Sequence, residues 1–183
     1  DEHVNSTLYS PEKPDREKLT NTISDMLSAN GFFEIMCNSL NPSTFYENGD
    51  FDVEKLVILA NPLSSDLNAM RQSLLYGGLS SVAWNINRQN ADLKLYEIGN
   101  CYFRIKQGKP FPSADDFSEK KTLGIFISGN TVPERWNSSP EPAGFYNLKS
   151  TAEMVMARLG IDPEMLDKGE SERKYYAESV TWS

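Results

Sequence analysis

The sequence predicts an α+β fold in which a mostly antiparallel sheet is flanked by helices. Two observations support this prediction. Patterns typical of helices and strands follow each other in the order helix, strand, strand, helix, a run of strands, helix, strand. Strand-like stretches are joined by connections as short as Gly99–Asn100, which favours antiparallel pairing because parallel neighbours need a longer crossover. A chain of 183 residues can bury its own core, and we expect residues 1–183 to form a single domain.

The first predicted helix has clear start and stop signals. Asp15 is suited to cap a helix that runs to Asn30, and Gly31 follows where such a helix should end. The apolar face of this helix consists of Leu19, Ile23, Met26 and Leu27. We then expect a strand over residues 32–40, one or two helical turns over 42–48 and a short buried strand over 54–60.

The stretch from Asn61 to Phe103 contains the second helix and the next strands. Apolar residues on one helical face predict burial of that face, and they are Leu75, Leu79, Val82, Ala83 and Ile86. Two glycines inside a helix cost about 1 kcal/mol each relative to alanine, so Gly77–Gly78 predicts a bend or a helix start near Gly77. Residues 93–98 are predicted as a strand that turns at Gly99–Asn100 and returns through 101–103.

The second half of the chain alternates strand and irregular segments before the last helix. We expect a loop over 108–121, a central strand over 122–129 and an irregular segment over 130–144, in which Trp136 packs over the sheet edge. A helix opens at Phe145 and stops at Gly160, with an apolar face of Leu148, Ala152, Val155, Met156 and Leu159. A loop over 161–172 leads to a final strand over 174–182.

Composition limits the classes of ligand. The formal net charge is −8 and no cluster of four or more Lys or Arg occurs, so nucleic acid is not expected as a primary ligand, because phosphate neutralisation supplies most of that affinity. No apolar run approaches the roughly 18 residues of a membrane span, so no membrane is expected among the partners. The first residues lack the basic and apolar regions of a secretory signal. We expect Cys37 and Cys101 to be free buried thiols and not a disulfide, which indicates a cytoplasmic location.

The residues of familiar catalytic sites are missing from the sequence. His3 is the single histidine, which speaks against a nucleophile–histidine pair and against a zinc site. No phosphate-binding glycine loop occurs. We interpret Glu97 as a hydrogen-bonding residue and not as a catalytic acid. The acidic pairs Asp115–Asp116 and Glu170–Glu172 are interpreted as solvated loop charges and not as cation ligands. We therefore predict no catalytic, cofactor-binding or metal-binding residues.

Several ordered blocks of the chain resemble one family. N-P-L-S at 61–64, M-R-Q-S-L-L-Y-G-G-L at 70–79, N-I-N-R at 85–88 and L-K-L-Y-E-I-G at 93–99 resemble the synthetase-like core module of the bacterial phenylalanyl-tRNA synthetase beta chain. The chain departs from the family wording at Tyr76, where most members have proline, and at Asn147 and Ser150, where aspartate and glycine are usual. The resemblance implies a class II aminoacyl-tRNA synthetase-like fold. It also implies a fragment, because further strands and a separate anticodon-binding domain follow in the family.

The resemblance further implies an interface. The first helix and strand resemble the first conserved motif of class II synthetases, through which subunits pair. We therefore expect a contact with the catalytic alpha chain, in an α2β2 assembly, through residues of this helix and strand: Leu19, Ile23, Met26, Leu27, Phe32 and Phe33.

The resemblance also bears on catalysis. Class II adenylation needs arginines fixed against the ATP phosphates, because charge develops there in the transition state. In the catalytic alpha chain the strand corresponding to 99–102 continues into arginine, whereas Phe103 stands here, with Arg104 one residue on. The expected function is therefore a non-catalytic scaffold, with ATP and magnesium used by the parent complex and tRNA bound through it. The alternatives are a tRNA-contacting module and, less favoured, a small class II-like adenylating enzyme.

Overall fold

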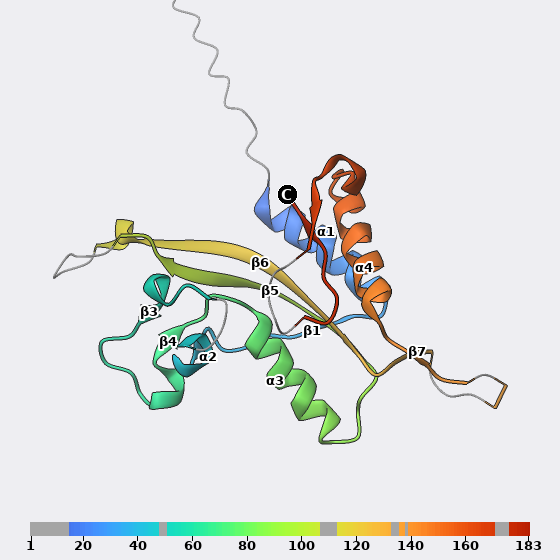
Figure 1. The fold of residues 1–183 in the computed structure, drawn as a ribbon, viewed down its shortest axis with the longest axis horizontal. Helices are drawn as coiled ribbons and strands as arrows, with labels where there is room; N and C mark the ends of the chain where they lie inside the picture. Colours follow the sequence, from blue (N-terminus) through green and yellow to red (C-terminus); the bar gives the residue numbers. More distant parts are fainter. Residues whose placement is uncertain (1–14, 48–50, 107–112, 133–135, 138, 171–175) are drawn as a thin grey trace, which may run out of the picture.

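The computed structural model describes residues 15–47, 51–106, 113–132, 136–137, 139–170 and 176–183. Within these residues the main sheet has the order β1 (Phe33–Glu34), β5 (Leu93–Arg104), β6 (Phe117–Ser128). The two long strands pair antiparallel from Leu93↔Ser128 to Arg104↔Phe117, and β1 runs parallel to β5 at its edge. Figure 1 shows this hairpin crossing the molecule with helices on both sides. The predicted α+β class is confirmed.

Two helices cover one face of the sheet. α1 (Arg16–Ala29) is capped by the Asp15 carboxylate, which accepts from the amides of Glu17 and Lys18, and Gly31 follows with φ +82°. α4 (Phe145–Arg158) lies beside it (Figure 1) and ends before Gly160. The core between helices and sheet consists of Ile23, Leu27, Phe32, Tyr96 and Val155. Tyr96 and Ile98 point to this face because side chains alternate along a strand.

The opposite face carries α3 (Leu75–Ile86) and a small lobe (Figure 1). The lobe contains β2 (Leu40–Asn41), α2 (Thr44–Glu47), β3 (Val57–Ile58), β4 (Ala69–Met70) and the 3-10 turns Val53–Lys55 and Ser65–Leu67. Its strands pair antiparallel in the order β2-β4-β3. The buried residues Tyr46, Leu56 and Ala69 form its core, against which Phe51 and Tyr76 pack.

Short elements complete the fold. They are the 3-10 turn Ala114–Asp116, the hairpin of β7 (Asn130–Val132) and β8 (Glu141–Pro142), the 3-10 turn Pro163–Met165, and the pair of β9 (Lys168–Gly169) and β10 (Thr181–Trp182). Trp136, beyond β7, is 97% exposed, so its predicted packing over the sheet edge is wrong. Cys37 and Cys101 are free thiols, as expected, but Cys101 is buried whereas Cys37 is half-buried. In the described ranges no helix has the length and apolarity to span a membrane.

Several predicted boundaries are corrected. β5 runs straight through Gly99 and Asn100, so there is no turn at that point, and its partner begins at Phe117, inside the predicted loop. The connection between them includes 107–112, which lie outside the described residues. The strand expected over 32–40 is reduced to Phe33–Glu34 and Leu40, and the strand expected over 54–60 keeps only β3, whose Ile58 is exposed. Among the described residues the final strand keeps only Thr181–Trp182, and positions 174–175 of the prediction lie outside them.

The paired glycines of α3 have a packing role. The helix begins at Leu75 and continues through both glycines. A Cβ at Gly77 would lie 2.8 Å from Cβ of Cys37, and one at Gly78 would lie 2.0 Å from Cζ of Phe126 on β6. Since real Cβ atoms do not come so close to other atoms, glycine lets the helix backbone lie directly on the sheet. The two glycines therefore mark a close approach and not the helix start.

Candidate functional site

A buried ion pair dominates the face of β5 that looks toward α3. Nη1 of Arg71, just after β4, lies 2.6 Å from Oε1 of Glu97, and both side chains are buried. Nε of Arg71 donates to the carbonyl of Asn100 at 2.9 Å, and Nη1 also donates to the carbonyl of Cys37 at 3.3 Å. The pair thus joins the small lobe, the segment after β1 and the main sheet.

Glycine at position 99 leaves the room that this arginine occupies. A Cβ built on Gly99 would lie 2.2 Å from Nη2 of Arg71. The amide of Cys37 donates to Oε1 of Glu97 at 3.3 Å, whereas Oε2 of Glu97 is buried without a hydrogen-bond partner among the described residues. Arg71 is therefore the main compensation for a buried carboxylate. The expected hydrogen-bonding role of Glu97 takes the form of this ion pair.

The thiol of Cys37 borders the same cluster. Its Sγ lies 3.5 Å from Oγ of Ser81 on α3. Burial raises the pKa of this thiol above its usual value, and the neighbouring Glu97 acts in the same direction. A thiol that holds its proton is a poor nucleophile, because the thiolate is the reactive form. The cluster of Cys37, Arg71 and Glu97 is therefore built for packing and charge compensation.

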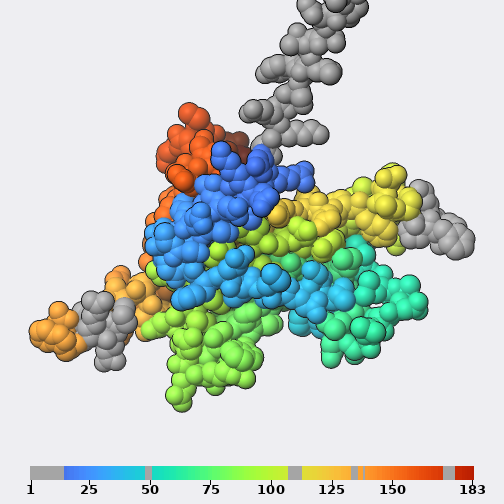
Figure 2. Space-filling model, turned by 180° about the vertical axis from the view of Figure 1, so that it is seen from behind, coloured from blue at the N-terminus to red at the C-terminus, as the bar shows by residue number. Residues whose placement is uncertain are grey.

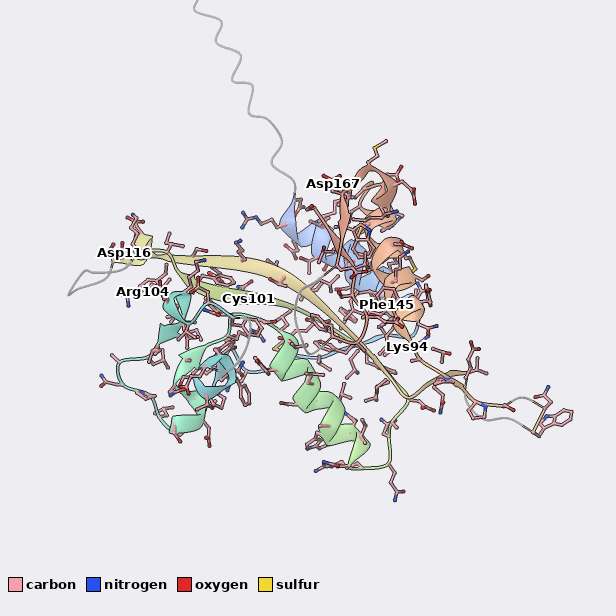
Figure 3. The ribbon with its side chains drawn as sticks, viewed as in Figure 1. Lys94, Cys101, Arg104, Asp116, Phe145 and Asp167 are labelled. Atoms are coloured by element: carbon pink, nitrogen blue, oxygen red, sulfur yellow. The ribbon has the colours of Figure 1, made fainter. Side chains whose placement is uncertain are left out.

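The end of β5 supplies no arginine to this cluster. Phe103 follows Glu97 and Cys101 in strand alternation and so shares their face, and Nζ of Lys120 lies 5.7 Å from its ring centre. Arg104 falls on the opposite face, and its Nε donates to the carbonyl of Lys106 at 3.1 Å. Figure 3 shows Arg104 and Asp116 near the end of the hairpin.

Asp116 differs from its predicted solvated state. It is buried, and its carboxylate accepts from the amide and the hydroxyl of Ser113 at 2.8 and 3.0 Å. These bonds close the base of the connection between β5 and β6. No group of three or more His, Cys, Asp or Glu in the described part of the chain is arranged to hold a metal ion.

The structure divides the six residues of the predicted interface. Ile23, Leu27 and Phe32 are buried in the domain's own core, so their predicted contact with a partner is corrected: they have no surface left for it. Met26 packs partly buried against that core. Leu19 and Phe33 are exposed, Phe33 at 72%. An interface on this helix and strand stays a prediction, carried by Leu19 and Phe33.

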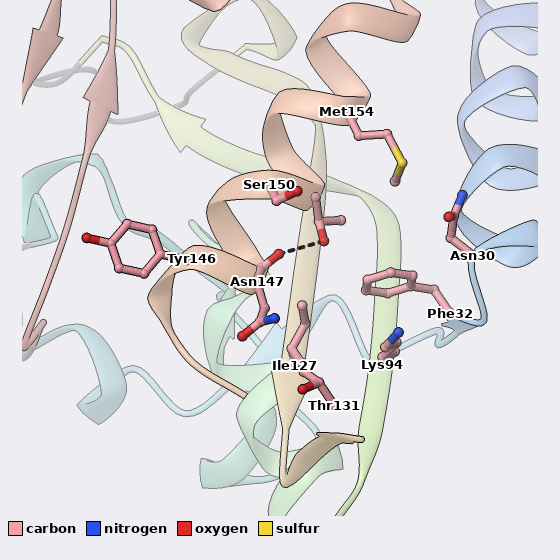
Figure 4. A pocket seen from close by; sticks show the side chains of 10 residues that line it. Asn30, Phe32, Lys94, Ile127, Thr131, Tyr146, Asn147, Ser150 and Met154 are labelled. Carbon is pink, nitrogen blue, oxygen red and sulfur yellow. Dashed lines mark hydrogen bonds between the residues drawn. The ribbon is translucent and has the colours of Figure 1, made fainter. Parts of the chain in front are cut away.

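A cavity of about 320 Å³ lies between α1, the sheet and α4. Figure 4 shows Phe32 and Lys94 on one side of it and residues of α4, including Asn147 and Ser150, on the other. Its lining holds one cation, Lys94, and no carboxylate, histidine or cysteine.

A second cavity of about 470 Å³ separates α4 from the last residues of the chain. Phe145, Leu148 and Trp182 are among its walls. Nε1 of Trp182 is buried without a hydrogen-bond partner in the described residues. The walls are mainly apolar, and neither cavity contains the Arg71–Glu97 pair.

Sequence reasoning identified Glu97 but missed Arg71, although the residue stands in one of the blocks that carried the family resemblance. No spacing rule links an arginine after one short strand to a glutamate 26 residues later in another sheet. The one local signal was Gly99, because a glycine inside a strand often marks the close approach of another group.

Comparison with known proteins gives the family. The model of the phenylalanyl tRNA synthetase beta chain CLM domain matches residues 4–181. The phenylalanine–tRNA ligase beta subunit of Bacteroides fragilis is 40% identical over 166 residues, which cover 90% of this chain and 20% of that protein. The subunit of Bacteroides thetaiotaomicron is 41% identical over 162 residues (87% and 20%), and that of Porphyromonas gingivalis 35% identical over 182 residues (97% and 22%). The chain spans about a fifth of the length of these relatives.

Solved structures with a similar fold are distant in sequence. A pyrrolysyl tRNA synthetase structure, PylSc of Desulfitobacterium hafniense, matches with a TM-score of 0.56 at 17% identity and covers 87% of this chain and 50% of that one. A crystal structure of pyrrolysyl-tRNA synthetase from the same organism matches with a TM-score of 0.60 at 16% identity and covers 93% and 56%. At these identities the likeness shows the fold, which is that of class II synthetases.

Proposed function

The chain belongs to the phenylalanyl tRNA synthetase beta chain CLM domain family, and on that premise we propose that it is a non-catalytic, synthetase-like module that docks on the catalytic alpha chain of a phenylalanine–tRNA ligase. In this proposal the α2β2 assembly ligates phenylalanine to its tRNA in the cytoplasm. The alpha chain uses ATP and magnesium, and tRNA is bound by the assembly as a whole.

The observation that supports a non-catalytic role is that Arg71 is used in a buried ion pair with Glu97. Adenylation requires cations held against the phosphates of ATP, where charge develops in the transition state. Arg71 is buried and paired with Glu97, and Phe103, on the same face, has no charge. Alternation places Arg104 on the other face. The residues that resemble the catalytic strand are thus used for internal packing.

The docking role is supported by the edge of the main sheet. β1 is an edge strand in the described sheet, so one side of its backbone is unpaired. Phe33 lies on this strand with 72% of its surface exposed. Unpaired strand edges and large exposed apolar side chains are both features of surfaces that meet another chain.

The test is association with the alpha chain. The alpha chain, tagged, is co-purified with the beta chain that carries Phe33→Asp, and stoichiometry is read by size exclusion with light scattering. Burying a phenylalanine contributes about 1.5 to 3 kcal/mol, so the variant should lose most of the complex. Met165→Asp, at a side chain that is 85% exposed in a distant turn, is the matched control and should assemble normally.

Three results would contradict the proposal. Normal assembly of Phe33→Asp, with circular dichroism showing a folded protein, would remove the docking surface from this edge. Saturable ATP binding by the beta chain alone would favour the adenylating alternative. Binding of tRNA by the beta chain alone, weakened by salt, would favour the tRNA-contacting alternative. Ile23→Asp is unsuitable as a test, because Ile23 belongs to the core and its substitution would unfold the domain.

A further inference from the structure

A lysine without a counter-charge faces the cavity between α1, the sheet and α4. Figures 1 and 2 both show blue α1 beside orange α4, and the cavity lies between these helices and the sheet. Lys94, on β5, is half-buried, and its Nζ lies 5.8 Å from the centre of the Phe32 ring. Among the described residues no carboxylate forms an ion pair with this ammonium. A half-buried cation in an open cavity is therefore left to pair with something outside the domain.

Asp92, two residues before Lys94, does not supply the missing charge. Its carboxylate accepts from the amide of Asn130 at 2.7 Å and from Nδ2 of Asn130 at 3.2 Å, and it lies outside the cavity lining. The net charge of −8 acts weakly on the cavity, because charges farther away than about 8 Å are screened at physiological ionic strength. A cleft with charge of one sign and walls of low dielectric focuses the field of that charge. The cavity thus attracts anions although the chain as a whole is acidic.

Two side chains of α4 add hydrogen-bond donors at the mouth of the cavity. Oδ1 of Asn147 accepts from the amide of Gly144 at 2.8 Å, whereas Nδ2 has no partner in the described ranges. The hydroxyl of Ser150 has none there either. Figure 4 shows both side chains on α4, across the cavity from Lys94. One cation and neutral donors together are the complement of an anionic oxygen group.

The rest of the lining is largely apolar. Phe32 is buried, and Ile127 and Met154 are half-buried. Small-molecule sites combine apolar walls of this kind with a few polar groups that orient the ligand. The volume of about 320 Å³ lies at the lower end of the range of roughly 300 to 1,000 Å³ that such sites occupy. A fitting ligand is therefore small and carries an apolar body next to its anionic group.

The charges in the lining also limit the ligand. A single lysine neutralises one negative charge, which matches a carboxylate, whereas a phosphate monoester carries about −1.5 to −2 at neutral pH. The lining has no carboxylate to pair with an ammonium group. An amino acid would bring its own ammonium toward Lys94, and like charges repel. Free amino acids, phenylalanine among them, consequently match the cavity poorly.

We propose that this cavity binds a small organic carboxylate that has a compact apolar body and no positive charge. Lys94 pairs with the carboxylate, Asn147 and Ser150 donate to its oxygens, and Phe32 and Met154 contact the apolar body. The site lies under the helices of the main sheet, and its ligand requires neither the alpha chain nor the proposed docking role. It gives the domain a binding activity of its own.

The experiment titrates 3-phenylpropanoate into the beta chain without the alpha chain. Methionine labelled with ¹³C in its methyl group allows NMR to follow Met154, and Met154→Leu assigns its signal. The phenyl ring should shift the Met154 signal saturably, while the signal of Met165, 85% exposed and outside the lining, should stay in place. Phenylalanine, which adds an ammonium, and 3-phenylpropanamide, which lacks the charge, should each bind at least about tenfold more weakly.

Two variants test the residues. Lys94→Met removes the charge and keeps an apolar stem, and Asn147→Asp keeps the oxygen that accepts from Gly144 but replaces the donor with a carboxylate. Each should weaken binding of 3-phenylpropanoate at least about tenfold. Lys168→Met is the matched control, since it removes the same charge from an exposed position on β9, and it should bind within about twofold of the unchanged chain. Circular dichroism confirms that the variants are folded.

Four results would overturn the inference. They are the absence of a saturable shift at Met154, binding of phenylalanine as tight as that of 3-phenylpropanoate, unchanged binding in the folded Lys94→Met variant, and displacement of 3-phenylpropanoate by inorganic phosphate at equal concentration. None of these results bears on the proposed function, because the alpha chain is absent from the titration. Conversely, failure of the alpha and beta chains to associate would leave this binding site untouched.

Discussion

Substituting Gly99 with alanine should destabilise the protein through Arg71. Inside a strand, glycine is ordinarily about 0.5 to 1 kcal/mol worse than alanine, so without other contacts the change would stabilise the fold. Here the added methyl would lie 2.2 Å from Nη2 and 3.1 Å from Cζ of Arg71, and 3.0 Å from Cδ2 of Leu74. The guanidinium must move, and with it the 2.6 Å bond to Glu97 is lost.

The magnitude follows from the burial of this pair. Breaking a buried ion pair costs about 3 to 5 kcal/mol, because a charge is left uncompensated. Oε2 of Glu97 has no partner among the described residues, so Glu97 has little else to compensate it. We therefore expect the free energy of unfolding to fall by about 3 kcal/mol. For a chain of this size that lowers the melting temperature by about 6 to 12 °C.

Urea unfolding followed by circular dichroism measures the change. Gly144→Ala is the matched control, since its added methyl would meet only Oδ1 of Asn147 at 3.9 Å, and it should cost less than about 1 kcal/mol. In an Arg71→Met background Gly99→Ala should cost clearly less than alone, because the clashing nitrogen is gone. If Gly99→Ala costs no more than Gly144→Ala, the proposed coupling between Gly99 and Arg71 is wrong.

Three further perturbations test other parts of the structure. Tyr46→Phe should cost about 2 kcal/mol, because two buried donors lose their acceptor, the hydroxyl. Burial also raises the pKa of the Tyr46 hydroxyl above its ordinary value of 10.0. The neutral hydroxyl therefore stabilises the folded state fully below pH 10.0, and this contribution is lost as the pH rises through the folded pKa. The Tyr46→Phe variant should accordingly lose less stability at alkaline pH than the unchanged chain does. Gly78→Ala should cost about 1 to 3 kcal/mol despite the higher helix propensity of alanine, because its methyl meets the Phe126 ring. Cys37 should react with iodoacetamide at pH 8 more slowly in the folded chain than in urea, because its pKa is raised and thiolate is scarce.

Each of these has a control and a contrary result. Tyr146→Phe, at a side chain 78% exposed, should leave stability and its pH dependence unchanged, and an equal effect at both tyrosines would contradict the role of burial. Ser80→Ala measures the gain in the free energy of unfolding that helix propensity alone provides. Gly78→Ala should instead lower the free energy of unfolding. If Cys37 were alkylated at the same rate in the folded and the unfolded chain, the fold would neither shield the thiol nor raise its pKa.

The sequence alone determined the elements whose signals are local. Asp15 and Gly31 mark the ends of α1 because capping and left-handed backbone depend on single residues. The α+β class with a mostly antiparallel sheet was also predicted correctly, although the connection at Gly99–Asn100 that favoured antiparallel pairing is not a turn. The family followed from ordered blocks of residues, and comparison with relatives confirmed it.

Tertiary structure decided the role of the glycines. Gly99 was predicted as a turn residue, and Gly77–Gly78 as a bend or helix start. In each case the glycine instead makes room for a group from elsewhere in the chain: Arg71, Cys37 or Phe126. A local pattern cannot distinguish a glycine needed for backbone conformation from one needed for close approach, because the neighbour responsible is remote in sequence.

Tertiary structure also decided which apolar residues form the core. Helical spacing grouped Leu75, Leu79, Val82, Ala83 and Ile86 on one side of α3. Of these, Leu75 and Val82 are half-buried, whereas the contact of Gly78 with Phe126 leaves Leu79 and Ile86 exposed to solvent. In the same way Ile23, Leu27 and Phe32 were taken up by the domain's own core, while Phe33 was left at the edge. Periodicity shows that residues share a face. What covers that face depends on the distances that the folded backbone permits.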